Sequence, residues 1–300
     1  LTAMLCCLLW GSAFPALKLS YAELGNLDAW QMLLLAGLRF TLAGAMVLMF
    51  GGLRLKIRVI PARREWPLLL AVAGLQTFGQ YVAYYIGMSH ITGVKGSILN
   101  SLSVFLVAVF AHFMSGNRSD ADRLSWRKAV GLLCGFAGVV VVNVTLLKGE
   151  KFSFAPEGEG LIVLQCVLSA LATVLVRIYG GKTDAVRLSG GQLAIGGLLL
   201  IAVGYAGNPQ GLAFTPAALI LLIYMAALSA AAFTLWFVML KYHKATVLEQ
   251  YKFAIPLFGT LLSVLLVPGE HIGPEMIAAA ALVAVGIWFV NREEKRISAS

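Results

Sequence analysis

Three charged side chains, Arg39, Glu249 and Lys252, lie inside long apolar stretches of the sequence. A charge at the centre of a bilayer costs at least about 2.5–3.5 kcal/mol, so such residues commonly mark a solute path or an internal ion pair. Glu249 and Lys252 are three residues apart and therefore share a helix face. They predict either a structural salt bridge or one wall of a solute cavity, in which Lys252 or Arg39 meets a carboxylate. Arg39 has a further alternative, which is to bind backbone carbonyls of a broken helix.

Amides, hydroxyls and aromatic rings are interleaved with these charges. Gln76, Gln80 and Tyr84 follow the spacing i, i+4 and i+8, which places them along one face of a helix. Converging groups of this kind are typical of a cavity for a small amphipathic solute rather than an inorganic ion. The side chains predicted to line such a cavity are Trp10, Ser12, Phe14, Arg39, Gln76, Gln80, Tyr81, Tyr84, Ser97, Asn100, Ser101, Gln165, Ser169, Phe233, Trp236, Glu249 and Lys252.

Other chemistry has little support in the sequence. The four histidines have no metal-ligand spacing, and no Ser-His-Asp set can be assembled at one membrane depth. No glycine-rich phosphate-binding motif follows a strand, so ATP is not predicted as the direct driver. The four cysteines sit in apolar stretches without C-x-x-C spacing, which favours a place in the core. We therefore predict no catalytic residue, no metal and no cofactor.

The composition indicates what surrounds these groups. The 300 residues are 60% hydrophobic and 12% charged, and the mean hydropathy is +0.86. A soluble domain of this size could not bury so much apolar surface in one core. Lipid must be the main solvent, which excludes a cytosolic enzyme, a secreted disulfide scaffold and a disordered chain.

Ten apolar runs are each long enough to cross about 30 Å of hydrocarbon as a helix. They are too long for membrane strands and do not alternate in polarity, so the predicted fold is an all-α integral membrane protein with ten transmembrane helices. The predicted spans are Leu1–Leu19, Asp28–Phe50, Trp66–Ser89, Thr92–Met114, Trp126–Leu147, Gly158–Arg177, Val186–Tyr205, Pro216–Val238, Thr246–Val267 and Pro274–Asn291.

The net charge is +9, and the distribution of the basic residues along the chain agrees with the predicted topology. With the N-terminus in the cytoplasm, 17 of the 23 lysines and arginines fall in cytoplasmic segments and 4 on the opposite side. This asymmetry obeys the positive-inside rule and predicts an inner-membrane protein with both termini cytoplasmic. Because the basic residues are scattered over five segments, they do not form a nucleic-acid footprint.

The two halves of the sequence, residues 1–147 and 148–300, resemble each other in the order of their residues. Five spans is an odd number, so the second half must begin on the opposite face of the membrane. Two inverted five-helix repeats then surround a site at mid-depth. The alignment pairs Cys7 with Cys166, Lys18 with Arg177, Arg39 with Gln192, Ser103 with Pro256, Gly138 with Gly286 and Asn143 with Asn291.

The chain resembles the ten-helix EamA-type branch of the drug/metabolite transporter superfamily. The likeness rests on Trp10-Gly11-Ser12-Ala13-Phe14-Pro15, Gly37-Leu38-Arg39-Phe40 and Pro256-Leu257-Phe258. Three positions depart from the family pattern: Asn117 stands where a glutamate is common, Ser103 stands where a proline is common, and Glu249 is separated from Pro256 instead of lying directly before it. The resemblance implies export as the direction of transport and amino acids or similar metabolites as the solutes.

We therefore predict a secondary transporter, not an enzyme, that works by alternating access in the lipid bilayer on a small-molecule solute. The proton is the candidate coupling ion, and Glu249 would be its carrier unless Lys252 holds it as a carboxylate. The alternatives are a multidrug or organic-cation exporter, a membrane-embedded enzyme, and a structural or regulatory membrane subunit. An organic-cation exporter would need more unpaired acids than bases in its cavity.

Overall fold

A computed structural model of the chain describes residues 1–25, 27–116, 122, 124–143, 154–266 and 275–299, without the side chains of 93, 94, 142 and 293–299. The described residues contain helices and connecting segments but no strand. The span ends Leu147, Val267 and Pro274 and the loop cations Arg118, Arg123, Lys148 and Lys151 lie outside the described residues. The helices are α1 (Thr2–Leu24), α2 (Ala29–Leu53), η1 (Arg63–Glu65), α3 (Trp66–Val72), η2 (Ala73–Gly79), α4 (Gln80–Met88), α5 (Gly93–Asn100), α6 (Leu102–Met114), α7 (Trp126–Val142), η3 (Pro156–Gly160), α8 (Leu161–Tyr179), η4 (Gly180–Lys182), α9 (Ala185–Gly207), α10 (Pro216–Tyr242), α11 (Ala245–Glu249), η5 (Gln250–Phe253), α12 (Ala254–Leu266) and α13 (Glu275–Ala299).

Each of the ten predicted spans is helical where it is described, which confirms the all-α membrane fold. Within the described ranges, seven helices are long and apolar enough to cross a membrane. The remaining three predicted spans are either shorter or divided into segments of different helical type. α7 has 17 residues, whereas span three (α3, η2 and α4) and span nine (α11, η5 and α12) change their helical pitch along their length. η2 is π-helical and η5 is a 3₁₀ segment, and such irregular turns in long helices are frequent at functional sites.

Local sequence determines where several spans begin. The Asp28 carboxylate accepts a hydrogen bond from the Gln31 backbone N–H at 2.8 Å, and the Gln31 side-chain oxygen accepts one from the Asp28 backbone N–H, which closes a capping box at α2. Asp184 caps α9, and Thr215 caps α10 directly before a proline in the first helical turn. These caps satisfy N–H groups that the helices themselves leave unpaired.

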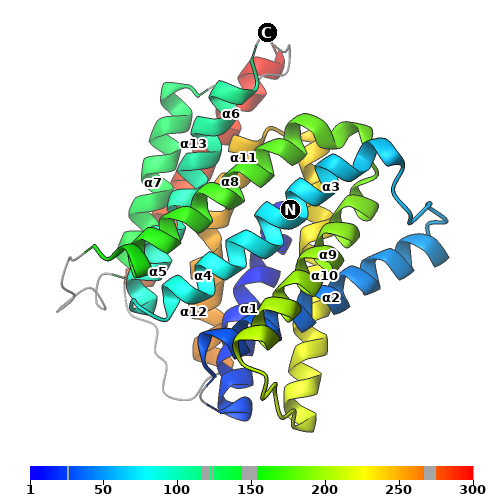
Figure 1. Cartoon of the computed structure of the whole chain (residues 1–300). Helices are drawn as coiled ribbons and strands as arrows, with labels where there is room; N and C mark the ends of the chain where they lie inside the picture. The colour runs from blue at the N-terminus through cyan, green and yellow to red at the C-terminus, as the bar shows by residue number, and fades with distance from the viewer. Residues whose placement is uncertain (26, 117–121, 123, 144–153, 267–274, 300) are drawn as a thin grey trace.

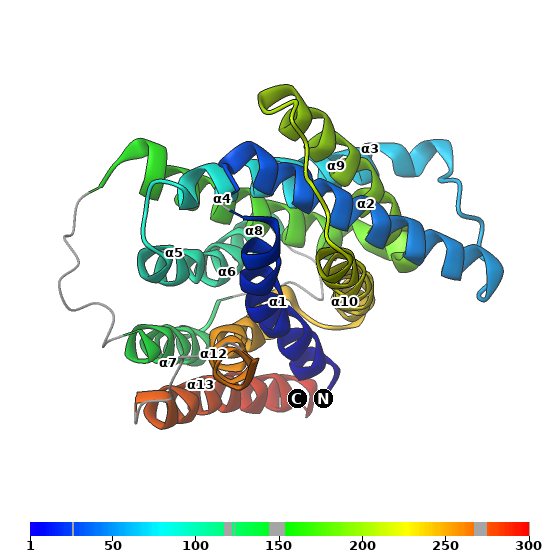
Figure 2. The same ribbon diagram turned by 90° about the horizontal axis from the view of Figure 1, so that it is seen from below.

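Two pairs of antiparallel helices, α2 with α9 and α7 with α13, lie on opposite sides of the bundle with α1 between them (Figures 1 and 2). In the first pair, a Cβ added at Gly37 would lie 2.9 Å from the carbonyl oxygen of Gly197, and one at Gly44 would lie 2.7 Å from that of Gly190. The sequence alignment of the halves pairs Gly37 with Gly190 and Gly44 with Gly197. Each contact is therefore the image of the other, as expected for two units related by a two-fold axis.

The pair α7 and α13 repeats this relation. A Cβ at Gly131 would lie 2.8 Å from the carbonyl oxygen of Gly286, and one at Gly138 would lie 3.0 Å from that of Ala279. The alignment that pairs Gly138 with Gly286 also pairs Gly131 with Ala279, so these two contacts are again images of each other. Antiparallel contacts of this kind are those that two inverted repeats make across a shared axis in the membrane plane.

The close approach of α2 and α9 leaves no room for a side chain at Gly44. We expect Gly44→Ala to lower the unfolding temperature of the purified protein, because its Cβ would meet the backbone of Ala194 and force the two helices apart. The free-energy cost is about 1–3 kcal/mol. Gly74→Ala is the matched control, because a Cβ there has no neighbour within 4 Å. Equal unfolding temperatures for the two variants would contradict this account of the helix pair.

Candidate solute cavity

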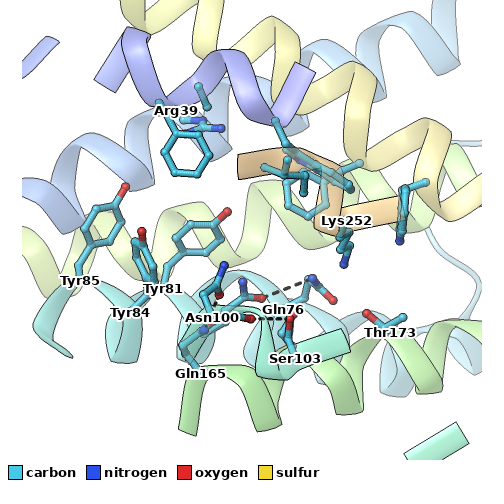
Figure 3. A pocket seen from close by; sticks show the side chains of 18 of the residues that line it. Arg39, Gln76, Tyr81, Tyr84, Tyr85, Asn100, Ser103, Gln165, Thr173 and Lys252 are labelled. Atoms are coloured by element: carbon cyan, nitrogen blue, oxygen red, sulfur yellow. Dashed lines mark hydrogen bonds between the residues drawn. The ribbon is translucent and has the colours of Figure 1, made fainter. Parts of the chain in front are cut away.

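A polar cavity of about 180 Å³ lies inside the bundle. Its walls come from both halves of the chain: α1, α2, span three and the α5–α6 region from the first half, and α8, α10 and span nine from the second half. The close-up in Figure 3 shows Arg39 across the cavity from Gln76 and Asn100. The lining residues are Trp10, Ala13, Phe14, Leu17, Arg39, Gln76, Gln80, Tyr81, Tyr84, Tyr85, Asn100, Ser103, Gln165, Ser169, Thr173, Phe233, Trp236, Phe237, Lys252 and Ile255.

A second, more apolar cavity of about 430 Å³ adjoins the first and shares Phe14, Tyr84, Asn100 and Lys252 with it, among other residues. It extends past Met32, Val104 and Pro256 towards the exposed residues Lys18 and Ser89. These two residues lie near the C-terminal ends of α1 and α4, so the combined cavity has its mouth at that end of the bundle.

Arg39 is 5% exposed and lies on the wall of the first cavity. Its Nε donates a hydrogen bond of 2.8 Å to the hydroxyl of Ser229 on α10, and its guanidinium lies 5.1 Å from the centroid of the Phe40 ring. The Ser229 hydroxyl in turn donates to the Met225 carbonyl at 2.7 Å. No acidic side chain among the described residues forms an ion pair with Arg39.

Lys252 is held differently. Its ammonium lies 2.7 Å from a carboxylate oxygen of Glu249, and it sits 5.5 Å from the ring centroid of Trp10 and 5.0 Å from that of Trp236. Glu249 is 1% exposed and lines neither cavity. A buried ion pair with two aromatic faces around the cation neutralises Lys252 within the wall. The sequence allowed either a salt bridge or a Lys252 side chain that meets a solute carboxylate. In the described conformation Lys252 forms the salt bridge with Glu249.

Span three contributes its polar face through the π-helical segment η2. Gln76 Nε2 donates to Gln80 Oε1 at 3.4 Å, and both residues line the cavity, as do Tyr81 and Tyr84 one turn further on. In an ideal α-helix, Tyr81 would not share the Gln76 face. The wider π turn brings both rows of side chains to the cavity.

The polar contacts of the wall follow the pseudo-two-fold relation. Arg39 on α2 bonds Ser229 on α10, and its counterpart Gln192 on α9 accepts a hydrogen bond from Thr77 on span three. Superposing Thr77 on Ser229 places three tyrosines of span three on three aromatic residues of α10, and all six line the cavity. The matched pairs are Tyr81 with Phe233, Tyr84 with Trp236, and Tyr85 with Phe237.

Of the seventeen side chains predicted from the sequence, the structure brings fifteen together. Thirteen line the first cavity, and Ser97 and Ser101 line the second. Ser12 and Glu249 line neither. The Ser12 hydroxyl donates to the Leu9 carbonyl and accepts from the exposed Tyr224, because it lies on the face of α1 that meets α10. A role in solute binding for the other fifteen stays a prediction.

Sequence reasoning missed Thr173 and Phe237, among other lining residues. Neither is unusual in an apolar helix, so polarity alone does not select them. The internal repeat could have selected Thr173, because the alignment of Cys7 with Cys166 also pairs Thr173 with Phe14. Among the described residues, no group of three His, Cys, Asp or Glu side chains is placed so that it could hold a metal ion.

Buried polar contacts lie at the end of the bundle away from the mouth. Lys128 Nζ lies 2.9 Å from Asp122, both side chains are 1% exposed, and the other Asp122 oxygen accepts from the backbone N–H of Thr246 at 2.7 Å. Nearby, Arg187 bonds Glu65 at 2.6 Å. The contacts of Asp122 with Thr246 and of Glu65 with Arg187 join the first half of the chain to the second, so ties between the halves close this end.

Comparison with known proteins identifies the architecture. The sequence pattern of the EamA-like transporter family matches residues 1–144 and again residues 157–292. The chain belongs to the EamA-like transporter family. It is 25% identical over 290 residues to an uncharacterized transporter, YvbV, of Bacillus subtilis, with 96% of this chain and 90% of the relative covered. It is 24% identical to the uncharacterized inner membrane transporter YedA of Escherichia coli, covering 93% and 84% of the two chains.

Two further matches are more distant in length or in sequence. A WAT1-related chloroplastic protein of Arabidopsis thaliana is 27% identical over 75% of this chain and 54% of its own. A crystal structure of a protein superposes with a TM-score of 0.77 at 22% identity, covering 96% of this chain and 98% of that one. This last likeness concerns the fold alone. The family and the names of the relatives indicate a membrane transporter.

The buried pair of Glu249 and Lys252 makes a prediction about stability. We expect Glu249→Gln to destabilise the protein by about 3–5 kcal/mol, because it leaves the Lys252 ammonium in the wall without its counter-charge. The double variant Glu249→Gln/Lys252→Met removes both charges and should recover most of the loss. Thermal unfolding of the three purified proteins measures this. A double variant as unstable as the single one would show that the ion pair is not the cause.

Glu65 makes a prediction about pH. Burial raises the pKa of its carboxyl, but the hydrogen bonds from the Ala62 N–H and from Arg187 outweigh this, and the net result is a pKa below the usual value. A lowered pKa adds stability above the unfolded-state value of about 4.3, and this contribution is lost as the pH falls through the folded-state value.

We therefore expect Glu65→Gln to lower the unfolding free energy by about 1–3 kcal/mol at neutral pH. The gap between the variant and the natural protein should close as the pH falls below about 4. Unfolding temperatures measured across this range test the sign, because other carboxyl groups titrate alike in both proteins. A gap that widens in acid would contradict it.

Proposed function

We propose that the protein is a secondary transporter that exports amino acids or similar small organic metabolites across the inner membrane by alternating access. The observation that carries this proposal is the cavity itself. Amides, hydroxyls and aromatic rings from both halves converge on it inside a bundle whose composition demands a lipid environment. A cavity with a mouth at one end and ties between the halves at the other is suited to exposing a bound solute to one side at a time.

The orientation is part of the same proposal. The basic residues of the predicted cytoplasmic segments, such as Arg58, Arg187 and Lys241, cluster at the end of the bundle that the ties close. The mouth lies at the opposite end. With both termini in the cytoplasm, the described conformation is open to the outside. The units that move against each other would be the two inverted repeats, residues 1–147 and 148–300, and the double match to the family supports this division.

We propose that transport is coupled to proton exchange. Whether Glu249 carries the proton is a separate question. This carboxylate is paired with Lys252 in the described conformation, so it can carry a proton only if the pair opens during the cycle. Transport that keeps its full pH dependence in Glu249→Gln would remove Glu249 as the carrier.

The organic-cation alternative is not favoured. Among the described residues, the lining of the two cavities contains Lys18, Arg39 and Lys252 but no aspartate or glutamate. A site for cations needs acidic or strongly electronegative groups directed at the solute.

Thiol labelling tests the mouth and the orientation. We expect Ser97→Cys, in the wall of the second cavity, to react with a membrane-impermeant thiol reagent added outside intact cells. Ser263→Cys is the matched control, because this serine is 3% exposed and lines neither cavity. Labelling of Ser97→Cys from the cytoplasmic side alone would reverse the proposed orientation.

Transport itself is tested with the purified protein in liposomes. We expect a panel of radiolabelled amino acids to include at least one that crosses the membrane faster than in protein-free liposomes. An imposed pH gradient should drive its accumulation. No saturable transport for any member, with or without the gradient, would argue against the proposed solute class.

A further inference from the structure

We propose that the cavity selects solutes that carry a carboxylate group, which Arg39 binds through the two terminal nitrogens of its guanidinium. An amine on the solute is not required, and a solute that carries only an amine is rejected. This inference rests on the proposed function and names the feature by which the same cavity would recognise its solute.

The charges of the wall are the first argument. Within the described residues, every ionisable side chain of Arg, Lys, Asp or Glu type that lines either cavity is basic. Lys18 lies at the exposed mouth, and Lys252 and Arg39 lie deeper. Glu249 compensates Lys252 from behind the wall, whereas no described acid compensates Arg39. The interior of the cavity therefore carries one uncompensated positive charge, and in a site of low dielectric such a charge strongly favours an anion over a cation.

The second argument is the way in which Arg39 is held. Ser229 accepts the hydrogen bond from Nε, and Ser229 is itself fixed by the bond to the Met225 carbonyl. This contact occupies only the Nε–H donor of the guanidinium. The two terminal nitrogens have no hydrogen-bond partner among the described residues, and they form the pair that a carboxylate can bridge with two parallel hydrogen bonds.

Lys252 is not the anchor, although it is also basic and lines the cavity. Its ammonium is occupied by Glu249 at 2.7 Å and by the faces of Trp10 and Trp236. A solute carboxylate would have to displace Glu249, which is 1% exposed and would then be left buried without its counter-charge.

Two further residues of the wall each have a polar atom without a partner. Trp236 Nε1 is a buried donor, and Gln76 Oε1 is a buried acceptor; neither has a hydrogen-bond partner among the described residues. Trp236 is 2% exposed and Gln76 is 6% exposed, and both line the first cavity. Buried polar atoms without partners are costly, and in the described conformation both atoms are enclosed by protein, so a solute could bind them only after a local rearrangement. The larger apolar cavity beside them, lined by Phe14, Met32 and other residues, would take the hydrocarbon body of the solute.

The experiment compares three compounds that share one aromatic body and differ only in charge: indole-3-propionate, tryptophan and tryptamine. They carry a carboxylate, both groups, and an amine, respectively. Equilibrium binding is measured on the full chain in lipid nanodiscs, so that no ion gradient is needed. We expect indole-3-propionate and tryptophan to bind. Tryptamine should bind at least about tenfold more weakly, because it lacks the charged hydrogen bonds to Arg39.

Variants then place the selectivity on Arg39. Arg39→Gln should weaken indole-3-propionate binding by about tenfold or more and leave tryptamine binding unchanged or stronger. Arg39→Lys keeps the charge without the bidentate geometry and should lie between the two. Arg54→Gln, at the exposed end of the same helix, is the matched control and should bind as the natural protein does.

If Arg39→Gln does not fold, the three compounds on the natural protein and on Arg39→Lys still decide the matter. Tryptamine that binds as tightly as indole-3-propionate overturns the inference, as does a failure of all three compounds to bind. The proposed function is judged separately by transport of the amino-acid panel. A protein that transports an amino acid but prefers tryptamine here keeps the proposed function and loses only the carboxylate selectivity.

Discussion

The cost of placing amide and charged groups in hydrocarbon governs this structure. A bilayer core offers no water to compensate such groups, so each polar side chain of a span must find a protein partner or face an enclosed wet space. Arg39, Gln76 and Gln165 do so at the centre of the bundle, and the side chains that face lipid are apolar, among them Leu198, Ile220 and Ile277. The position of the cavity follows from this sorting, because only the interface between the two halves can collect polar groups from eight or more helical segments at once.

Close helix contacts make that interface possible. Glycines in α2 and α9, and in α7 and α13, allow backbones of opposite direction to touch, and the contacts occur in image pairs such as Gly37 with Gly197 and Gly44 with Gly190. In a membrane, where lipid is as apolar as leucine, such packing replaces the hydrophobic effect as the force that joins helices. Between these two antiparallel pairs, α1, α8, α10 and the irregular spans three and nine form the walls together with α2 and the α5–α6 region.

The walls are alike in position but not in chemistry. Tyrosines of span three face Phe233, Trp236 and Phe237 of α10, and Arg39 is matched by the neutral Gln192. The aromatic residues of the two walls therefore occupy corresponding positions, whereas the charged Arg39 has a neutral counterpart. Corresponding positions in two inverted repeats are what the proposed alternating access requires, because the repeats then exchange roles between two conformations. In the proposed carboxylate selectivity, this difference in charge would give a bound solute a single orientation, and this is how the carboxylate inference and the transport proposal fit together.

The sequence alone determined the features that depend on solvent and on order along the chain. Apolar length established the spans, the internal alignment paired Arg39 with Gln192, and the polar and aromatic side chains inside the spans indicated thirteen lining residues of the first cavity. Helix rotation and long-range partners were decided only by the tertiary structure. Ser12 turns towards Tyr224 because the packing of α1 on α10 sets its direction, and the π-helical turns of η2 bring Tyr81 to the cavity. Spacing alone allowed Lys252 either to pair with Glu249 or to meet a solute, and it offered no partner for Arg39. The tertiary structure decided both, because a buried charge is neutralised only by what the folded chain places beside it.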